Sequence, residues 1–198
     1  MFLLIWIIIG AMRIYVEDNL AAQKLGLEIY KLGSSANFRG IDLLCIGTDR
    51  ATGDSLGPLV GNFLSKGLHP NKHLVRLFGT LKQPVHANNI CDIINIIDKT
   101  DRLLIAVDAS LGNMNNVGFI NIGLGNVYPG ASLSKDLPAV GDIFITGVVN
   151  SRSPFAGMEG ATLLSTRLSV VMGMARIIAR GLLFGVNMLC YEEEIMIL

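Results

Sequence analysis

Apolar residues recur along the chain in two spacings, one typical of buried strands and one typical of helices. Short continuous apolar runs predict strands that are covered on both faces, because such strands have no polar side. Apolar side chains that return every three or four positions predict helices. These rules predict strands at residues 41–46, 74–78 and 103–107, and helices at residues 18–32, 55–66 and 87–97.

Predicted strands and helices alternate through the first half of the chain, and this alternation is typical of parallel βαβ units. Two further strands are expected at residues 118–122 and 142–148, followed by one long helix at residues 157–183. The segment at residues 123–141 is a long loop, and long loops inside compact domains are often functional. We therefore expect a single α/β domain over residues 13–198.

The N-terminal residues 1–9 are all apolar, and Arg13 is the first charged residue. This run is about half of the roughly 20 apolar residues that a membrane-spanning helix needs. It also lacks the basic segment that opens a secretory signal. Three interpretations stay open for residues 1–12: a stub added by an upstream start codon, a short tail that packs on the domain, or a weak membrane anchor. We treat these residues as an apolar stub and expect no stable membrane insertion.

The chain of 198 residues is 51% hydrophobic and 16% charged, against roughly 25% charged in an average soluble domain. This balance excludes a disordered chain, which needs low hydrophobicity and high net charge. Lys plus Arg and Asp plus Glu both number 16, so no basic excess points to a nucleic-acid partner. Three irregularly spaced cysteines indicate core thiols in a reducing compartment, without a structural zinc site.

In open parallel sheets, ligands bind beyond the carboxyl ends of the strands. The segments after the first and third predicted strands carry carboxylates, and the segment after the second carries a histidine. Two polar residues that follow the strand at residues 142–148 are candidates for the same edge. The candidate site residues are therefore Asp49, Arg50, Asp54, His86, Asp108, Asn150 and Arg152.

Asp54 and Asp108 are the candidates for catalysis. Each also has an ordinary structural interpretation, since Asp54 precedes a helix that it could cap and Asp108 ends a strand and could hold the next turn. Two carboxylates that face one cleft push their pKa values apart, so that one holds a proton while the other activates water. Because the predicted fold brings both residues to one sheet edge, we expect this pair to carry the chemistry.

Glycine motifs around the first loop suggest two other chemistries. A phosphate-binding loop is not favoured, because five residues separate Gly47 from Gly53 and Asp54 stands where the lysine should be. Residues 53–57 spell GDSLG, which satisfies the G-x-S-x-G pattern of serine hydrolases. Those enzymes take their histidine from late in the chain, whereas His86 is the last histidine here. A triad of Ser55, His86 and Asp108 in another order stays open as an alternative.

Motifs around both aspartates resemble a known family. IG at residues 46–47 followed by DSLGP at 54–58 is similar to the first aspartate motif of the germination protease that degrades small acid-soluble spore proteins. IAVDA at residues 105–109 is similar to its second aspartate motif. The similarity continues through INI, PGAS and ITGV at residues 120–122, 129–132 and 145–148. Within that superfamily, the length and the sequence GTDR at residues 47–50 most resemble the YyaC group of sporulation proteins, described as spore proteases.

The resemblance implies a three-layer α/β/α sandwich around a mostly parallel sheet, a fold shared with hydrogenase maturation proteases. It assigns the catalytic aspartates to Asp54 and Asp108. It also implies a peptidase in the cytoplasm of a sporulating cell or spore, with a spore protein such as a small acid-soluble spore protein as substrate. The alternative is a non-catalytic sporulation factor that uses the same fold to bind a protein. The oligomeric state stays open, a homo-oligomer included.

The chain also departs from the germination protease, because it is much shorter, has no evident propeptide, differs at residues 131–139 and carries Tyr128 where that family has histidine. Hydrogenase maturation proteases recognise nickel through two acidic residues and a histidine, and residues 123–141 contain no histidine. A neutral phenol binds divalent metals weakly, which leaves His86 as the candidate for a third ligand. We therefore expect no cofactor and no tightly bound transition metal.

Overall fold

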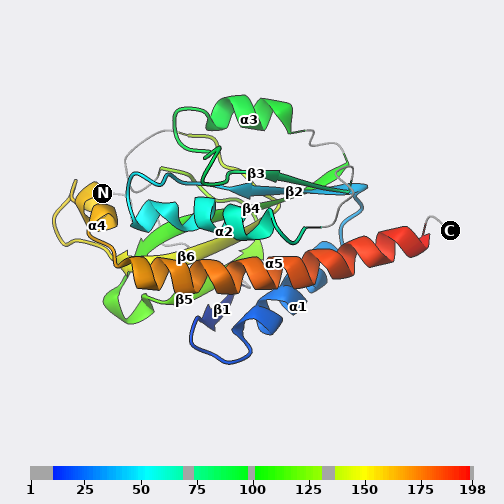
Figure 1. Ribbon diagram of the computed structural model, residues 1–198, viewed down its shortest axis with the longest axis horizontal. Helices are drawn as coiled ribbons and strands as arrows, with labels where there is room; N and C mark the ends of the chain where they lie inside the picture. The colour runs from blue at the N-terminus through cyan, green and yellow to red at the C-terminus, as the bar shows by residue number, and fades with distance from the viewer. Residues whose placement is uncertain (1–10, 69–73, 98–100, 131–136, 197–198) are drawn as a thin grey trace.

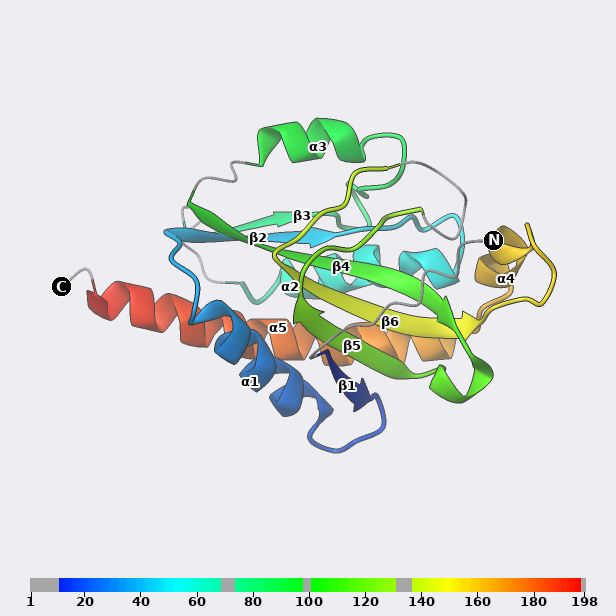
Figure 2. The ribbon, with the colours of Figure 1, turned by 180° about the vertical axis from the view of Figure 1, so that it is seen from behind.

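The computed structural model describes residues 11–68, 74–97, 101–130 and 137–196. Its centre is a six-stranded sheet in the order β1-β5-β6-β4-β2-β3 (Figure 2). Strands β3, β2, β4 and β6 are parallel, whereas β5 is antiparallel to β6 and β1 is antiparallel to β5. The strands are β1 (Met12–Tyr15), β2 (Gly40–Cys45), β3 (Val75–Phe78), β4 (Arg102–Gly112), β5 (Phe119–Leu124) and β6 (Ile143–Ser151).

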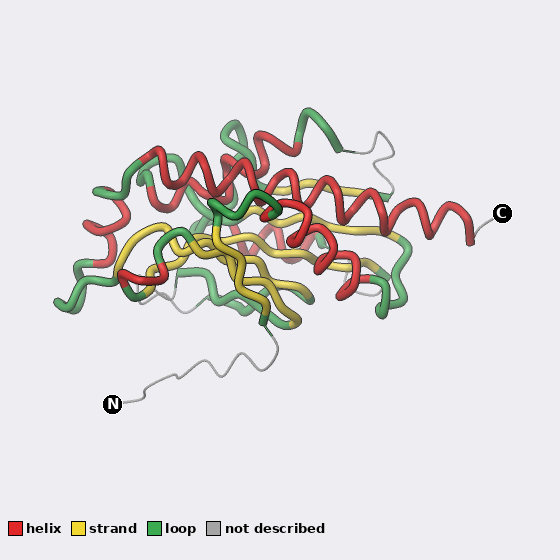
Figure 3. Tube along the Cα trace, turned by 90° about the horizontal axis from the view of Figure 1, so that it is seen from below, coloured by secondary structure: helices red, strands yellow, loops and turns green. Residues whose placement is uncertain are grey.

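Helices cover both faces of this sheet (Figures 1 and 3). Helices α1, α2 and α5 lie on one face and α3 lies on the other, while α4 lies near the end of β6. This arrangement confirms the expected three-layer α/β/α sandwich around a mostly parallel sheet. The helices are α1 (Ala21–Gly33), α2 (Leu56–Leu64), α3 (Ile90–Ile96), α4 (Glu159–Leu164) and α5 (Leu168–Met196), with 3-10 turns η1 (Gly53–Ser55) and η2 (Met114–Asn116).

Side chains of the central strands alternate between two apolar cores. Leu43 and Ile105 are fully buried in the core under α1, α2 and α5. The next residue on each strand, Leu44 and Ala106, is fully buried in the core on the α3 face. The strands therefore read as continuous apolar runs in the sequence because both of their faces are covered.

The strand predicted at residues 103–107 is longer than expected, because β4 continues to Gly112. The last pair between β2 and β4 joins Cys45 to Val107, whereas β4 goes on pairing with β6 from Asp108 to Gly112. The apolar run ends where β4 loses its neighbour on one side. The predicted end of this strand was wrong because β4 still pairs with β6 beyond Val107, where the continuous apolar run in the sequence has stopped.

The single helix predicted at residues 157–183 is two helices, α4 and α5. Between them the hydroxyl of Thr166 donates to the carbonyl of Thr162 at 2.9 Å, and the hydroxyl of Ser165 donates to the same carbonyl at 3.1 Å. Side-chain bonds of this kind compete with the regular helix ladder. Apolar periodicity continues across the break, which is why the sequence pattern did not reveal it.

The N-terminal stub and helix α5 are the two apolar segments that could contact a membrane. Met12 pairs with Ile122 in the sheet, whereas residues 1–10 of the predicted stub lie outside the described residues. Within α5, Leu168–Tyr191 is long and apolar enough to cross a membrane by length and composition alone, yet half of its most apolar stretch is buried inside the protein. A half-buried apolar helix is typical of a protein core, and the membrane expectation stays a prediction.

Helix α2 lies close to the end of β2, and Gly57 makes this approach possible. A Cβ atom on Gly57 would stand 2.1 Å from the carbonyl oxygen of Ile46 and 2.6 Å from the nitrogen of the same residue. Both are backbone atoms, which cannot rotate away as a flexible side chain can. The absence of a Cβ at Gly57 therefore fixes the start of α2 against the chain that leaves β2.

We expect Gly57→Ala to lower the free energy of unfolding by about 1–3 kcal/mol, the usual cost of overpacking. Gly173→Ala is the matched control, because nothing lies within 4 Å of a Cβ added at Gly173 in α5, and alanine there favours the helix. Urea denaturation of both variants measures the difference. An unchanged stability of Gly57→Ala would contradict the close contact.

Candidate active site

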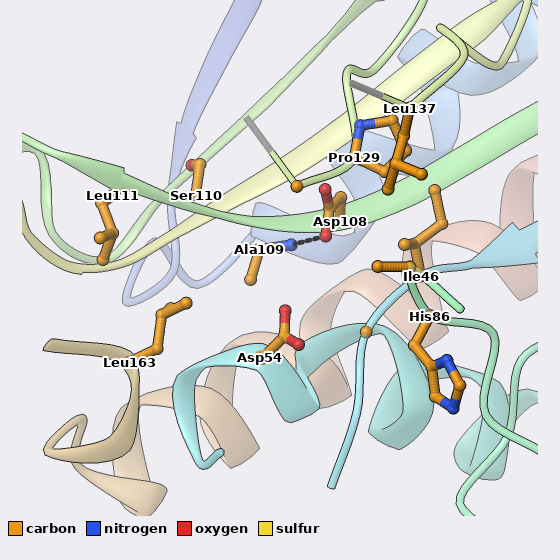
Figure 4. A pocket seen from close by; sticks show the side chains of 13 residues that line it. Ile46, Asp54, His86, Asp108, Ala109, Ser110, Leu111, Pro129, Leu137 and Leu163 are labelled. Atoms are coloured by element: carbon orange, nitrogen blue, oxygen red, sulfur yellow. Dashed lines mark hydrogen bonds between the residues drawn. The ribbon is translucent and has the colours of Figure 1, made fainter. Parts of the chain in front are cut away.

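A pocket forms where β2 ends and β4 continues. After Cys45 the chain of β2 turns away, so that β4 has no strand on that side from Asp108 onwards in the described structure. The open flank of β4 is covered instead by the loop after β2, by α4 and by the connection between β5 and β6. The residues that line the pocket are Ile46, Gly47, Asp54, His86, Ala87, Asp108, Ala109, Ser110, Leu111, Pro129, Gly130, Leu137 and Leu163 (Figure 4).

The pocket is small. Its volume is about 40 Å³, which is room for roughly two or three water molecules. Asp54 and Asp108 reach it from different elements, since Asp54 lies in η1 ahead of α2 and Asp108 lies in β4. Figure 4 shows the two carboxyl groups on opposite sides of the same pocket. The geometry therefore brings together the two carboxylates that the sequence singled out.

The backbone around Asp54 is fixed by a tight turn after β2. Gly47 has a φ of +139°, and a Cβ there would stand 2.0 Å from the carbonyl oxygen of Asp54, so glycine is required. The N–H of Thr48 donates to that carbonyl at 3.0 Å, and the N–H of Gly47 donates to the carbonyl of Val85 at 2.8 Å. These contacts hold Asp54 beside the end of the sheet.

The ordinary structural role considered for Asp54 is not seen. The N-cap position of α2 is occupied by Ser55, and neither η1 nor α2 has a side-chain hydrogen bond at its N-cap. The carboxyl of Asp54 is thus directed to the pocket rather than to the helix. Asp108 does hold its own backbone, since one carboxyl oxygen accepts the N–H of Ala109 at 2.8 Å. That bond leaves the second oxygen of Asp108 for other chemistry.

The environment raises the pKa of both carboxyl groups, and of Asp108 most. Burial raises the pKa of Asp108 well above its ordinary value of 3.8, and the negative charge of Asp54 raises it further, against the opposing hydrogen bond from Ala109. Burial also raises the pKa of Asp54, while the backbone N–H of Thr48 and the charge of His86 lower it. Interacting carboxyl groups favour sharing one proton, and the directions of these shifts favour Asp108 as the group that holds it.

This division gives the pair an acid and a base. A protonated Asp108 can donate a proton, whereas an ionised Asp54 can accept one from water. Two carboxyl groups titrating as a pair is the arrangement by which aspartic proteases activate water. The pocket between them has room for that water. The arrangement therefore suits hydrolysis.

His86 joins the site from the segment after β3, as the strand-end rule predicts. It lines the pocket, and its Nδ1 accepts the backbone N–H of Asn88 at 3.3 Å. In Figure 4 its imidazole points away from both carboxyl groups. The charge of His86 lowers the pKa of Asp54, and substrate binding by His86 stays a prediction.

Four other candidates for substrate binding do not line the pocket. Asp49 and Arg50 are exposed on the loop after β2, and Arg152 is exposed after β6. The amide of Asn150 donates to the carbonyl of Thr162 and to the hydroxyl of Thr166, each at 3.2 Å. Asn150 thereby ties β6 to the break between α4 and α5, next to the pocket wall. Substrate binding by these four residues stays a prediction.

Sequence reasoning did not single out Leu137 and Leu163, which close the pocket. Leu163 comes from α4, inside what reads as one continuous helix, and Leu137 comes from the long loop before β6. The only available signal was the length of that loop. Pro129 and Gly130 at its start also line the pocket, whereas Tyr128 is 53% exposed.

The alternative serine triad is not assembled in this structure. The hydroxyl of Ser55 donates to the carbonyl of Thr52 at 2.6 Å, and Ser55 is buried. Ser55 does not line the pocket that holds Asp108 and His86. A nucleophile must reach the reacting carbon, so the geometry favours the aspartate pair.

A transition-metal site does not fit these residues. Among the described residues, no three His, Cys, Asp or Glu side chains gather as metal ligands. Within the part of the chain that the structure describes, the aspartate pair has no imidazole partner, because the ring of His86 points away from it (Figure 4). Ni²⁺ and Zn²⁺ favour imidazole ligands, whereas carboxylates and water suit Mg²⁺ or Ca²⁺ loosely. The segment at residues 131–136, part of the loop expected to supply a third ligand, lies outside the described residues.

We expect protein purified without a histidine tag to contain far less than one equivalent of nickel or zinc. Elemental analysis by inductively coupled plasma mass spectrometry measures this directly. Asp108→Ala is the control, because it removes one potential ligand. Near-stoichiometric metal that disappears in Asp108→Ala would contradict the expectation.

The chain is similar to known proteins over most of its length. It is 46% identical over 167 residues to the uncharacterized protein YyaC of Bacillus subtilis (strain 168), covering 83% of this chain and 78% of that protein. The crystal structure of a NiFe hydrogenase maturation protease, HycI from Thermococcus kodakarensis KOD1, matches with 15% identity and a TM-score of 0.47, covering 75% of this chain and 93% of that one. Residues 13–181 match the model of the family described as "Protein of unknown function (DUF1256)". The chain therefore belongs to the DUF1256 family, of which it is a YyaC-like member.

Proposed function

We propose that this protein is a peptidase in which Asp54 and Asp108 act as an acid–base pair on a spore protein. The observation that carries the proposal is the placement of both carboxyl groups in one pocket, with the pKa of Asp108 raised by burial and by the charge of Asp54. Side chains held in such different protonation states are typical of acid–base sites. The sequence similarity around both aspartates to the germination protease supports the choice of a peptide bond.

The reaction uses the two groups in sequence. Ionised Asp54 accepts a proton from a water molecule as the water oxygen attacks the carbonyl carbon of the peptide bond. Protonated Asp108 donates its proton to the leaving nitrogen as the carbon–nitrogen bond breaks, which yields a carboxyl group and an amine. The two products together take up the atoms of one water, its oxygen in the new carboxyl group and one hydrogen equivalent on the amine, and a proton transfer from Asp54 back to Asp108 restores the pair.

The size of the pocket limits what it can hold. A volume of about 40 Å³ admits water and a peptide group, but no large side chain. Side chains of a substrate must therefore lie outside the pocket, along the surface around it. A substrate segment must reach the pocket in an extended form, as an unstructured or locally unfolded stretch.

The proposal is tested by incubating the purified protein with small acid-soluble spore proteins, the substrate class implied by the germination protease. We expect new N-termini at one or a few bonds, detected by mass spectrometry. Asp108→Asn is the matched control and should leave the substrates intact. Cleavage that is equal in the two proteins would refute the aspartate mechanism, and the absence of any cleavage would refute this substrate class.

A second candidate is a non-catalytic factor that binds a protein. The observation that favours it is a set of exposed apolar side chains around α4, beside the pocket wall. Phe155 is 73% exposed and Leu164 is 61% exposed. Exposed apolar patches often mark protein contacts. Capture of a spore protein that is never cut, equally by the unmodified protein and by Asp108→Asn, would favour this candidate.

A further inference from the structure

Strand β3 forms one edge of the sheet. It pairs with β2 on one side, and the part of the chain that the structure describes supplies no strand on its other side. The N–H of Ile41 donates to the carbonyl of Leu74 at 2.6 Å, which places the backbone groups of residue 74 toward β2. Because backbone direction alternates along a strand, Arg76 and Phe78 also face β2. The N–H and C=O groups of Val75 and Leu77 therefore face away from β2, and of these two residues only Leu77 is partly exposed, since Val75 is 5% exposed.

A second and larger pocket adjoins this edge. Its volume is about 400 Å³, and it lies between β3, the turn after β3 and helix α3. Its walls are mainly apolar, with Phe78, Val85 and Ile93 among them, and both Phe78 and Ile93 are only partly buried. A pocket of this size falls in the range of ligand sites and has room for a large apolar side chain.

The two pockets are neighbours, because His86 lines both of them. Val85, which lines the larger pocket, forms a parallel bridge with Ile46, which lines the smaller one. A chain that leaves the β3 edge at its carboxyl end therefore passes His86 on the way to Asp54 and Asp108. The small pocket cannot hold a large side chain, whereas the larger one can. The small pocket would therefore take a peptide group of the substrate, and the larger pocket would take an apolar side chain of the same substrate.

We propose that an extended segment of the substrate adds to the outer edge of β3 and places an apolar side chain in the pocket beside α3. The outward N–H and C=O groups of Leu77 supply the main-chain hydrogen bonds, as in other cases where a peptide adds a strand to a sheet edge. The segment then continues past His86 and presents its peptide bond to the aspartate pair. This inference rests on the proposed peptidase function and defines its substrate as an extended segment with one apolar residue near the cleaved bond.

The experiment measures binding separately from cleavage. The Asp108→Asn variant is immobilised and exposed to a randomised pool of unstructured ten-residue peptides, and the retained peptides are identified by mass spectrometry. We expect them to share an apolar residue at one position. Hydrogen exchange of the complex should be slowed at the N–H group of Leu77. Affinity of one retained peptide is then measured by calorimetry.

Leu77→Pro, added to Asp108→Asn, removes an outward N–H from β3, and proline is tolerated at such edge positions. We expect at least a tenfold loss of affinity for the retained peptide. Arg13→Pro in the opposite edge strand β1 is the matched control and should not change the affinity. The N–H of Arg13 also faces outward, because the N–H of Val16 donates to Gly118 on the β5 side and direction alternates. Methylating alternate nitrogens of the peptide tests the same bonds without altering the protein.

Any one of three results would overturn the strand-addition site. These are that no peptide is retained, that the Leu77→Pro and parent proteins bind the peptide with equal affinity, or that N-methylation of the peptide leaves its affinity unchanged. None of these results bears on whether the aspartate pair cleaves a peptide bond. Cleavage is judged separately, by comparing the unmodified protein with Asp108→Asn. A cleaving enzyme that retains no peptide at β3 would refute this inference and leave the proposed function standing.

Discussion

Replacing Asp108 with asparagine will reduce peptide hydrolysis by about 10²–10⁴-fold, the usual contribution of a positioned acid or base. Asparagine keeps the shape of the side chain and can still accept the N–H of Ala109, the bond that Asp108 makes at 2.8 Å. It cannot hold a transferable proton. Because the side chain lines a pocket and does not pack in the core, the fold should be unchanged.

Asp54→Asn should have a similar effect, since it removes the base that accepts the proton from water. Asp101→Asn is the matched control, because Asp101 is exposed just before the start of β4, at the opposite end of that strand from Asp108, and does not line the pocket. The measurement is the initial rate of cleavage of one spore protein by each variant, with the fold checked by circular dichroism. Full activity in either Asp108→Asn or Asp54→Asn would assign the chemistry elsewhere, with Ser55 and His86 next in line.

Asp42→Ala will lower the free energy of unfolding by about 3–5 kcal/mol, the typical cost of removing one partner from a buried ion pair. Asp42 is fully buried in β2 and pairs with two arginines on the neighbouring strands. Arg76 donates through Nε at 2.7 Å and through Nη2 at 2.5 Å, and Arg102 donates through Nε at 2.8 Å. Without the carboxylate, two guanidinium groups remain close together in a partly buried place.

Urea denaturation measures this effect. Asp18→Ala is the comparison, because Asp18 pairs with Lys24 at the exposed start of α1, and exposed ion pairs contribute little to stability. We expect a much smaller change for Asp18→Ala than for Asp42→Ala. Equal effects of the two substitutions would show that the buried network is not what joins β2, β3 and β4 at this end of the sheet.

The sequence predicted the architecture well where the chain is covered on both faces. Continuous apolar runs located β2, β3 and β4 to within one residue at their starts, because burial on both faces leaves a strong hydrophobic signal. The same signal failed at Asp108, where β4 continues beside a pocket. It also failed at Thr166, where hydroxyl bonds end a helix without disturbing its apolar spacing. Asp42 was not singled out, because one acidic residue inside an apolar run says nothing of its two partners.

The placement of Asp54 and Asp108 in one pocket was predictable because strand ends in a parallel sheet meet at one edge. Asp54, Asp108 and His86 all follow that rule and line one pocket. The remaining walls of the pocket come from the connection between β5 and β6 and from α4. Their positions depend on the antiparallel direction of β5 and on the break before α5. Those segments bring residues far apart in the sequence, such as Ile46 and Leu163, to one pocket, and no local pattern encodes this arrangement. Asn150 illustrates the same limit, since its position near the edge was predicted but its bonds to Thr162 and Thr166 were not.

The pairing of Asp54 with Asp108 is tested most directly by carbon-13 NMR titration of the aspartate carboxyl carbons, assigned by single substitution to asparagine. We predict that Asp108 titrates well above its ordinary pKa of 3.8, because of burial and the charge of Asp54. In Asp54→Asn the pKa of Asp108 should fall toward the ordinary value and stay above it, since burial remains. An Asp108 that titrates near 3.8, or one whose pKa is unchanged by Asp54→Asn, would contradict a shared proton between the two carboxyl groups.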